Sequence, residues 1–111
     1  MFIVSPKRCG GLFLLYLLAC SRVSGQPVNY IGIEQGLSNN AVTSIYQDAR
    51  GFMWFGTYDG LNRYDGYGFK VYRNVIGDSA SLCSNSIYTI SGDNDDHVWV
   101  GTQRGVSVFD Q

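Results

Sequence analysis

The sequence of 111 residues is poor in charge, proline, cysteine and histidine. Charged side chains make up 15%, the formal net charge is -1, and no basic cluster follows the first eight residues. Because binding to phosphates needs several clustered cations, nucleic acid is not expected as a partner. With one histidine and no catalytic motif around it, this segment is not expected to be an enzyme, to hold a metal or to bind a cofactor.

The first 25 residues predict a secretory signal peptide and are set aside from the fold. Lys7 and Arg8 precede an apolar run, GLFLLYLLA, which is far shorter than the ~20 residues that span a bilayer as a helix. The stretch SRVSG then favours cleavage before Gln26. Two alternatives stay open: a membrane anchor that is never cut, and a lipoprotein signal lipidated at Cys20. We expect an exported chain, periplasmic in location.

Removal of residues 1–25 leaves Cys83 as the only cysteine. A single thiol forms no intrachain disulfide, so the mature part depends on an apolar core. A core is marginal in a domain of this size. Small exported domains without disulfides usually belong to something larger, and we expect the same here.

What the sequence does contain is typical of strands and turns. Aromatic residues make up 14%, with eight Tyr, and there are 14 Gly. Outside the signal no segment shows the 3.6-residue periodicity of an amphipathic helix. The mature chain is therefore expected to be all-β.

The dominant feature is an internal repeat. Aligning Leu37 with Leu82 sets an offset of 45 residues, and the alignment runs without a gap to Asp65 and Asp110. Nine of these 29 pairs are identical, where chance gives roughly two with ordinary residue usage. A period of this length is expected for propeller blades of four strands each.

The pattern inside the first copy fits four short antiparallel strands: VTSIYQD, FMWFGT, LNRY and FKVYR, separated by turns at ARG, YDG and DGYG. We expect a fragment of a β-propeller with about two four-stranded antiparallel blades after an N-terminal signal helix. Residues 36–80 would form the first blade and residues 81–111 an incomplete second one. Residues 26–35 would be a lone strand that completes the last blade of the ring.

Five repeated positions have a structural explanation. Asp opens a turn, Trp fills the wedge between neighbouring blades with an indole N–H that needs an acceptor, and the first Gly permits close approach of the backbone. Thr holds the next turn through its hydroxyl, and the second Gly adopts positive φ there. These residues are Asp48, Trp54, Gly56, Thr57 and Gly60 in the first copy, and Asp93, Trp99, Gly101, Thr102 and Gly105 in the second.

Closed propellers usually need about 4 to 8 blades, and this chain encodes fewer than two. We therefore expect a fragment that exposes unpaired strand edges and apolar blade faces. Such surfaces favour aggregation. The partners expected first are the remaining blades of a parent chain.

The stretch GLSNNAVTSIYQDARGFMWFGTYDGLNRYDG resembles the two-component regulator propeller repeat. The shared pattern is Leu-Ser-x-Asn, a hydrophobic strand, Asp-x-x-Gly, apolar-Trp-apolar-Gly-Thr and Gly-Leu-x-Arg-Tyr. The second copy departs from it, with Asp96 in place of Gly51 and GVSVFD in place of GLNRYD.

The resemblance implies the N-terminal part of a periplasmic sensor domain in a hybrid two-component protein. Such a parent would be a homodimeric histidine kinase anchored in the inner membrane. Many sensors of this family respond to oligosaccharides, so a glycan fragment is the implied ligand. The segment itself would sense without catalysis.

Other functional interpretations are weaker. His97 lies at a strand start and not in the helical motif of a kinase phosphoacceptor. The acidic stretch DNDD, residues 93–96, lacks the sixth-position Gly and closing Glu of an EF-hand loop. Cys83 and His97 lack the context of a catalytic pair.

Polar and aromatic residues near the blade turns are candidates for ligand contact, and they are equally expected as solvated turns. They are Tyr58, Asp59, Arg63, Gln103 and Arg104. Two alternatives to a kinase sensor stay open. One is an exported propeller lyase or glycosidase, which needs converging carboxylates or a metal, and the other is the sensor of a diguanylate cyclase.

Overall fold

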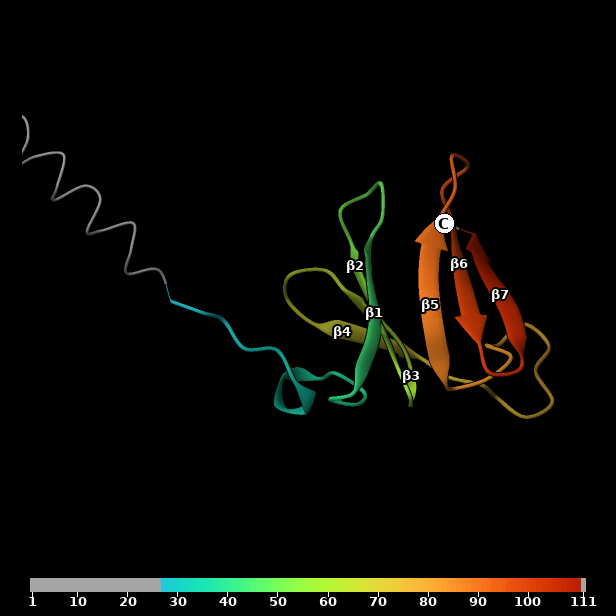
Figure 1. Cartoon of the computed structure of the whole chain (residues 1–111), viewed down its shortest axis with the longest axis horizontal. Coiled ribbons are helices and arrows are strands. Elements are labelled where there is room, and N and C mark those ends of the chain that lie inside the picture. The colour runs from blue at the N-terminus through green and yellow to red at the C-terminus, as the bar shows by residue number, and fades with distance from the viewer. Residues whose placement is uncertain (1–26, 111) are drawn as a thin grey trace, which may run out of the picture. The chain divides into compact units, whose positions relative to one another are not determined.

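The structure, a computed structural model, describes residues 27–110, which are almost entirely β-strands and turns (Figure 1). The elements are the 3₁₀ helix η1 (Ile33–Gln35) and the strands β1 (Val42–Gln47), β2 (Met53–Thr57), β3 (Gly60–Tyr64), β4 (Phe69–Tyr72), β5 (Ile87–Gly92), β6 (His97–Thr102) and β7 (Gly105–Asp110). The predicted all-β fold is confirmed. The signal peptide expected over residues 1–25 lies outside the described residues. Between residues 27 and 110, no helix is long and apolar enough to cross a membrane.

The first sheet contains β1, β2, β3 and β4 in chain order, all antiparallel. Glycine makes two of its turns possible. Gly51 adopts φ 92° between β1 and β2, and Gly60 adopts φ 121° after the turn that follows β2. A Cβ at Gly60 would also lie 2.8 Å from the carbonyl oxygen of Tyr72. This position therefore needs glycine for both its conformation and the space around it.

The second sheet contains β5, β6 and β7 and repeats the first sheet at the offset of 45 residues. The pairing register shifts between Val42 and Ser44 in the first sheet and between Ile87 and Thr89 in the second. The equivalence therefore extends to this irregularity of the backbone. Within residues 27–110 no strand pairs with the outer edge of β7.

The core lies between the two sheets, which pack with β5 against β1 and β2 (Figure 1). Side chains alternate along each strand, so each sheet presents one set of apolar residues to the other. The buried cluster is Trp54, Leu61, Leu82, Ile87, Ile90, Val98 and Val100.

Glycines make this close packing possible. A Cβ at Gly56 would lie 2.5 Å from Cγ2 of Ile87 in the other sheet, and Gly92 leaves room for the ring of Tyr46. A hydrogen bond from Thr43 Oγ1 to the Ile87 carbonyl, 2.7 Å long, also joins the sheets. The repeated glycine was expected to permit close approach of the backbone. At Gly56 the group that approaches is the side chain of Ile87 from the other sheet.

The strand expected over residues 26–35 was predicted to pair within the last blade of the ring, which the described residues do not include, so it stays a prediction. Residues 27–31 have no regular structure, and η1 follows. The side chain of Gln35 accepts the backbone N–H of Gly32 at 2.7 Å, and Gly36 ends the turn at φ 111°. A strand needs a partner for its backbone groups, and residues 27–110 supply none beside this segment, so local bonds close it instead.

Candidate functional site

The repeated Asp and Trp of the first sheet form one hydrogen-bonded unit. Asp48 Oδ1 accepts the backbone N–H groups of Arg50 and Phe52 at 2.9 and 3.0 Å, which fixes the β1–β2 turn. Asp48 Oδ2 accepts the indole N–H of Trp54 at 2.8 Å. Both side chains are buried. The aspartate that opens the turn is therefore also the acceptor that the indole requires.

The second sheet repeats this unit around Asp93. Asp93 Oδ1 accepts the N–H groups of Asp95 and His97 at 2.9 and 3.1 Å, and Oδ2 accepts the indole N–H of Trp99 at 2.8 Å. These bonds, the indole first, hold the pKa of the Asp93 carboxyl well below its ordinary value. The shift stabilises the folded chain above the ordinary pKa of an aspartate, and the stabilisation is lost as the pH falls below it.

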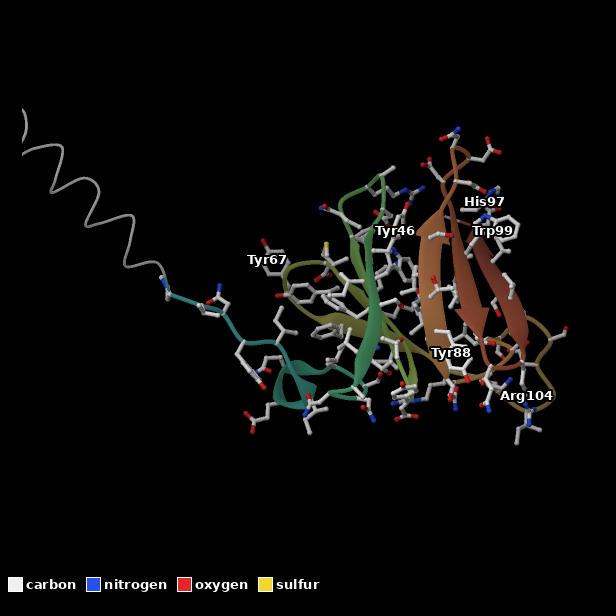
Figure 2. All side chains as sticks on the ribbon, viewed as in Figure 1. Tyr46, Tyr67, Tyr88, His97, Trp99 and Arg104 are labelled. Atoms are coloured by element: carbon white, nitrogen blue, oxygen red, sulfur yellow. The ribbon has the colours of Figure 1, made fainter. Side chains whose placement is uncertain are left out.

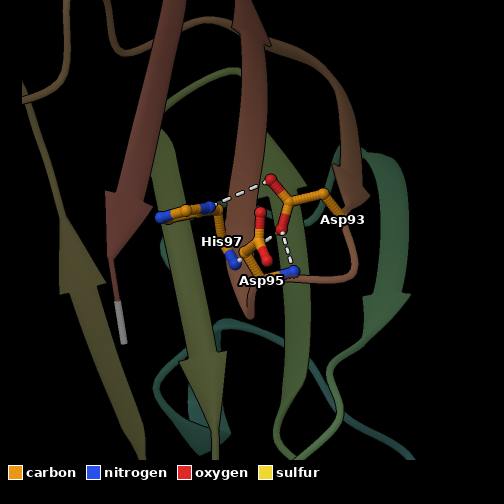
Figure 3. A group of neighbouring side chains, drawn as sticks. All are labelled: Asp93, Asp95 and His97. Carbon is orange, nitrogen blue, oxygen red and sulfur yellow. Dashed lines mark hydrogen bonds and ion pairs between the residues drawn. The ribbon is translucent and has the colours of Figure 1, made fainter.

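A group of three titratable residues, Asp93, Asp95 and His97, surrounds this turn (Figure 3). His97 Nδ1 lies 3.0 Å from Asp93 Oδ2, and its Nε2 lies 3.8 Å from a carboxylate oxygen of Asp110. The hydrogen bond to Asp93, together with the neighbouring carboxylates, raises the pKa of the imidazole.

Potential ligand atoms of this group lie within 4.8 Å of one another, so a metal site has to be considered. The Asp93 carboxylate is already occupied by two backbone groups, an indole and an imidazole. In the first sheet Asp48 makes the same bonds to its turn and to an indole. The positions there that correspond to Asp95 and His97 carry neither an acid nor a histidine. The turn and the tryptophan therefore explain the group, and we infer no metal site from it.

The repeated threonines hold the turns that follow β2 and β6. Thr57 Oγ1 donates to the Gly60 carbonyl at 3.0 Å, and Thr102 Oγ1 donates to the Gly105 carbonyl at 2.8 Å. The backbone N–H of Asp59 returns a bond to Thr57 Oγ1. Each hydroxyl thus satisfies two turn groups at once.

A polar network that the sequence reasoning missed extends from these threonines. In the first sheet Ser38 Oγ lies 2.8 Å from Thr57 Oγ1 and accepts a bond from the Asn62 amide. In the second sheet Cys83 takes the place of Ser38, with Sγ 3.1 Å from Thr102 Oγ1.

Ser107 takes the place of Asn62 in this network and donates to Cys83 Sγ at 3.2 Å. The Ser107 and Thr102 hydroxyls lower the pKa of the Cys83 thiol. The sequence did contain one indication of this network: a small polar residue, Ser38 or Cys83, stands at the same position of both repeats.

The candidate ligand residues do not form a single cluster. Tyr58 and Asp59 occupy the β2–β3 turn, and Gln103 and Arg104 occupy the equivalent β6–β7 turn at the same end of the strands, where Figure 2 labels Arg104. Arg63 lies apart from these turns: it pairs with Trp54 across the sheet, and its guanidinium is 4.9 Å from the Phe52 ring centroid.

Arg73 is a further charged residue at this end of the molecule, and the sequence reasoning did not single it out. Its guanidinium lies 3.2 Å from Asp59 Oδ2 and also donates to the Asp59 carbonyl. Both side chains are about half exposed. Asp59 lies in the turn after β2 and Arg73 follows β4. No spacing within the repeat indicates that residues at these two positions form an ion pair.

The two repeated tryptophans differ in their surroundings. Trp54 is 1% exposed; its ring stacks on Tyr72 and packs at a tilt against Phe109, with ring centroids 5.9 and 5.8 Å away. Trp99 is 43% exposed, on the side of its sheet that faces away from the first sheet (Figure 2). Each tryptophan thus lies on the same face of its own sheet, and only the first of these faces is covered.

Two sheets built from one repeat and packed face to face in the same sense are consecutive blades of a β-propeller. The family model described as "Two component regulator propeller" matches residues 36–59 and 81–104. These two segments are therefore two-component regulator propeller repeats.

Comparison with solved structures gives the same result. The chain is similar to the extracellular domain of a protein described as the hybrid two-component system BT3049 from B. thetaiotaomicron, with a TM-score of 0.63 and 37% identity over 73% of this chain. It is also similar to the extracellular domain of BT4673 from the same organism, with a TM-score of 0.59 and 29% identity over 63% of this chain.

A curated relative, histidine kinase P4 of Formosa agariphila, is 54% identical over 44 residues, which is 40% of this chain. The chain spans only a small part of these proteins: 13% of the first structure, 10% of the second and 3% of the kinase.

Proposed function

We propose that the chain is part of the extracellular, periplasmic propeller of a two-component sensor and contributes to ligand detection without catalysis. The observation that carries the proposal is the pair of family repeats, packed as adjacent blades as in the extracellular domains it resembles. The parent would be a histidine kinase that forms a homodimer and is anchored in the inner membrane. Binding would act by favouring one arrangement of the propeller over another.

An oligosaccharide is the ligand we propose for the parent. The turns at Tyr58–Asp59 and Gln103–Arg104 offer an exposed aromatic ring and several hydrogen-bonding groups at the same end of two adjacent blades. Neighbouring blades repeat such turns around a propeller axis, so ligand groups can be held by more than one blade. The residues lie on turns between rigid strands, where binding residues commonly occur.

Catalysis by this segment is not supported by how its acids are used. Asp48 and Asp93 bind turn N–H groups and indoles, and Asp59 pairs with Arg73. Asp65 accepts the N–H groups of Gly68 and Tyr67, which lower its carboxyl pKa. A glycosidase needs two carboxylates that flank a substrate bond, and these four carboxylates are engaged in structure.

A reporter assay in a host that carries the parent gene tests this proposal. The probes are defined oligosaccharides from several plant and algal polysaccharides, added one class at a time. We expect one class to induce the reporter and Arg104→Ala with Gln103→Ala to weaken the response, while Ile76→Ala, on an exposed connecting loop, leaves it unchanged. Release of cleaved sugar by the purified propeller, or induction that survives deletion of both repeats, would contradict the proposal.

A further inference from the structure

The β2–β3 turn of the first blade is fixed by hydrogen bonds from three parts of the chain. Thr57 Oγ1 on β2 donates to the Gly60 carbonyl and accepts the Asp59 N–H, both at 3.0 Å. The Gly60 N–H donates to the carbonyl of Asn85 at 2.7 Å, at the entry to the second blade. Arg73, directly after β4, binds the Asp59 carbonyl. All of these groups lie within the chain, so the arrangement does not depend on any further blade.

One peptide unit of this turn is held at both of its ends. The Asp59 carbonyl and the Gly60 N–H belong to the same planar amide. Arg73 Nε donates to the oxygen at 3.1 Å, and the Asn85 carbonyl accepts the N–H. Asn85 Oδ1 also accepts the N–H of Asn74, the residue after Arg73, at 2.7 Å. Rotation of this peptide unit would therefore break a bond on each side.

The Arg73 side chain makes two further contacts with the turn. Its Nη2 lies 3.2 Å from Asp59 Oδ2, and a Cβ at Gly60 would lie 3.2 Å from its Cγ. The planar guanidinium binds a backbone oxygen and a carboxylate of one residue together, a geometry that the point charge of a lysine does not reproduce. Because both side chains are about half exposed, the ion pair adds little to the stability of the fold. Its effect is to fix the orientation of the turn.

These bonds divide the roles of the two turn residues. The carbonyl and the carboxylate of Asp59 are both engaged by Arg73. The Tyr58 side chain is 57% exposed and makes no hydrogen bond with the residues that the structure describes. The face of an aromatic ring carries partial negative charge and stacks on the apolar C–H face of a sugar. Tyr58 is therefore the side chain of this turn that is available to a ligand.

We propose that Arg73 is a positioning residue for ligand detection: it holds the β2–β3 turn so that Tyr58, and not Asp59, contacts the sugar. The inference rests on the proposed function, since it assigns roles within one of the same ligand-binding turns. Asp59 acts as the partner of Arg73. Loss of the guanidinium should weaken binding although neither Arg73 nor Asp59 touches the ligand.

Amide hydrogen exchange of the full chain, measured residue by residue, tests the positioning without any ligand. Arg73→Met keeps the aliphatic stem and removes the guanidinium, and we expect the Gly60 amide to exchange about tenfold faster or more. Asp59→Asn keeps the carbonyl and an accepting side-chain oxygen, so exchange should stay within about twofold of the wild type. Arg50→Met, at an exposed arginine in the turn at the other end of β2, is the matched control and should change nothing at Gly60.

The reporter strain that carries the parent gene tests the ligand contact, with the oligosaccharide class that induces the wild type. We expect Tyr58→Ala and Arg73→Met each to raise the half-maximal inducing concentration about tenfold or more, with the maximal response unchanged. Asp59→Asn should stay within about twofold of the wild type, because its bonds to Arg73 can still form. Arg73→Lys should shift the concentration less than Arg73→Met does, since it keeps the charge and the stem. A loss of folded protein would instead lower the maximal response.

The outcomes separate this inference from the proposed function. Gly60 exchange that Arg73→Met leaves unchanged would overturn the positioning role, whatever the reporter shows. A response that Asp59→Asn weakens as strongly as Arg73→Met, or that Tyr58→Ala leaves unchanged, would overturn the division of roles.

A wild type that no oligosaccharide induces would overturn the proposed function and the contact of Tyr58 with it. Faster Gly60 exchange in Arg73→Met would still establish in that case that the guanidinium holds the turn. If circular dichroism shows that Arg73→Met unfolds the chain, Arg73→Lys replaces it in the exchange measurement, with a smaller acceleration expected.

Discussion

Asp48 and Trp54 show what the repeat requires at the scale of single residues. One carboxylate fixes the turn with one oxygen and receives the buried indole with the other. Asp93 and Trp99 do the same at an exposed site. The pair is retained in both copies because the turn and the wedge between blades are built by the same two side chains.

The turn between β5 and β6 carries a local strain that the first sheet avoids. Asp96 adopts φ 62°, the only non-glycine residue with positive φ among those described, where the first sheet has Gly51. We predict that Asp96→Gly raises the free energy of unfolding by about 0.5–1 kcal/mol, because a Cβ is disfavoured in this region. Urea titration measures the change.

The reciprocal substitution is the control for this prediction. Gly51 has no atom within 4 Å of an added Cβ, so Gly51→Asp tests conformation without a clash and should destabilise by a similar amount. If neither substitution changes the free energy of unfolding, Asp adopts the left-handed conformation at these two positions without loss of stability.

The only histidine of the sequence makes stability depend on pH. Asp93 and the nearby carboxylates raise the pKa of His97 above its ordinary 6.5. As the pH rises, the unfolded chain therefore loses the proton of His97 at a lower pH than the folded chain does. The stabilisation is complete below 6.5 and is lost as the pH rises through the raised pKa.

We predict that His97→Phe, which copies Phe52 of the first sheet, removes this dependence. Urea unfolding at pH 5.5 and 7.5 should show a smaller difference in free energy of unfolding for the variant than for the wild type. The same loss of stability between these two values in both proteins would show that the imidazole is uncoupled from Asp93.

The residue roles that sequence reasoning reached were local ones. Positive φ at Gly60 and the hydroxyl bonds of Thr57 follow from turn chemistry within a few residues. The acceptor of the indole was recognised as necessary, but its partner was not named, because spacing alone does not show which way a carboxylate points. The bond between Ser38 and Thr57 was missed since nineteen residues separate them.

At the scale of elements, the alternation of apolar residues and the turn signals in the sequence were sufficient to predict the strands of the first sheet. They were not sufficient to predict where each strand begins and ends. The four expected strands of the first copy all form. The expected strand over residues 26–35 stays a prediction, because the blade that it would complete is not among the described residues. Strand propensity is realised only when another strand supplies the ladder.

The same element position has different energetic weight in the two sheets. Leu61 on β3 is 0% exposed, and its equivalent Val106 on β7 is 63% exposed. We predict that Leu61→Ala lowers the free energy of unfolding by about 2–5 kcal/mol, through lost burial and a cavity. Val106→Ala should change it by less than about 0.5 kcal/mol.

Thermal or urea unfolding of this matched pair, at a concentration where the chain is monomeric, gives both values. Comparable losses in the two variants would mean that the face of the second sheet that carries Trp99 and Val106 is covered in solution by another part of the same chain.

At the scale of the whole molecule, the repeat length predicted the blades but not their contacts. Which face of one sheet meets which face of the next depends on sheet twist and on small residues such as Gly56 and Gly92. The five candidate ligand residues remain a prediction, since four lie on two equivalent turns and Arg63 lies apart.

Iodide quenching of tryptophan fluorescence tests most directly that the two repeats are neighbouring blades with one covered and one open face. Trp54 is 1% exposed and Trp99 is 43% exposed. At monomeric concentration, the Trp99→Phe variant should retain only blue-shifted emission that iodide scarcely quenches, whereas the wild type should show an additional, readily quenched component. Emission from Trp54 that iodide quenches as strongly as that of Trp99 would contradict the packing of the second blade against the first.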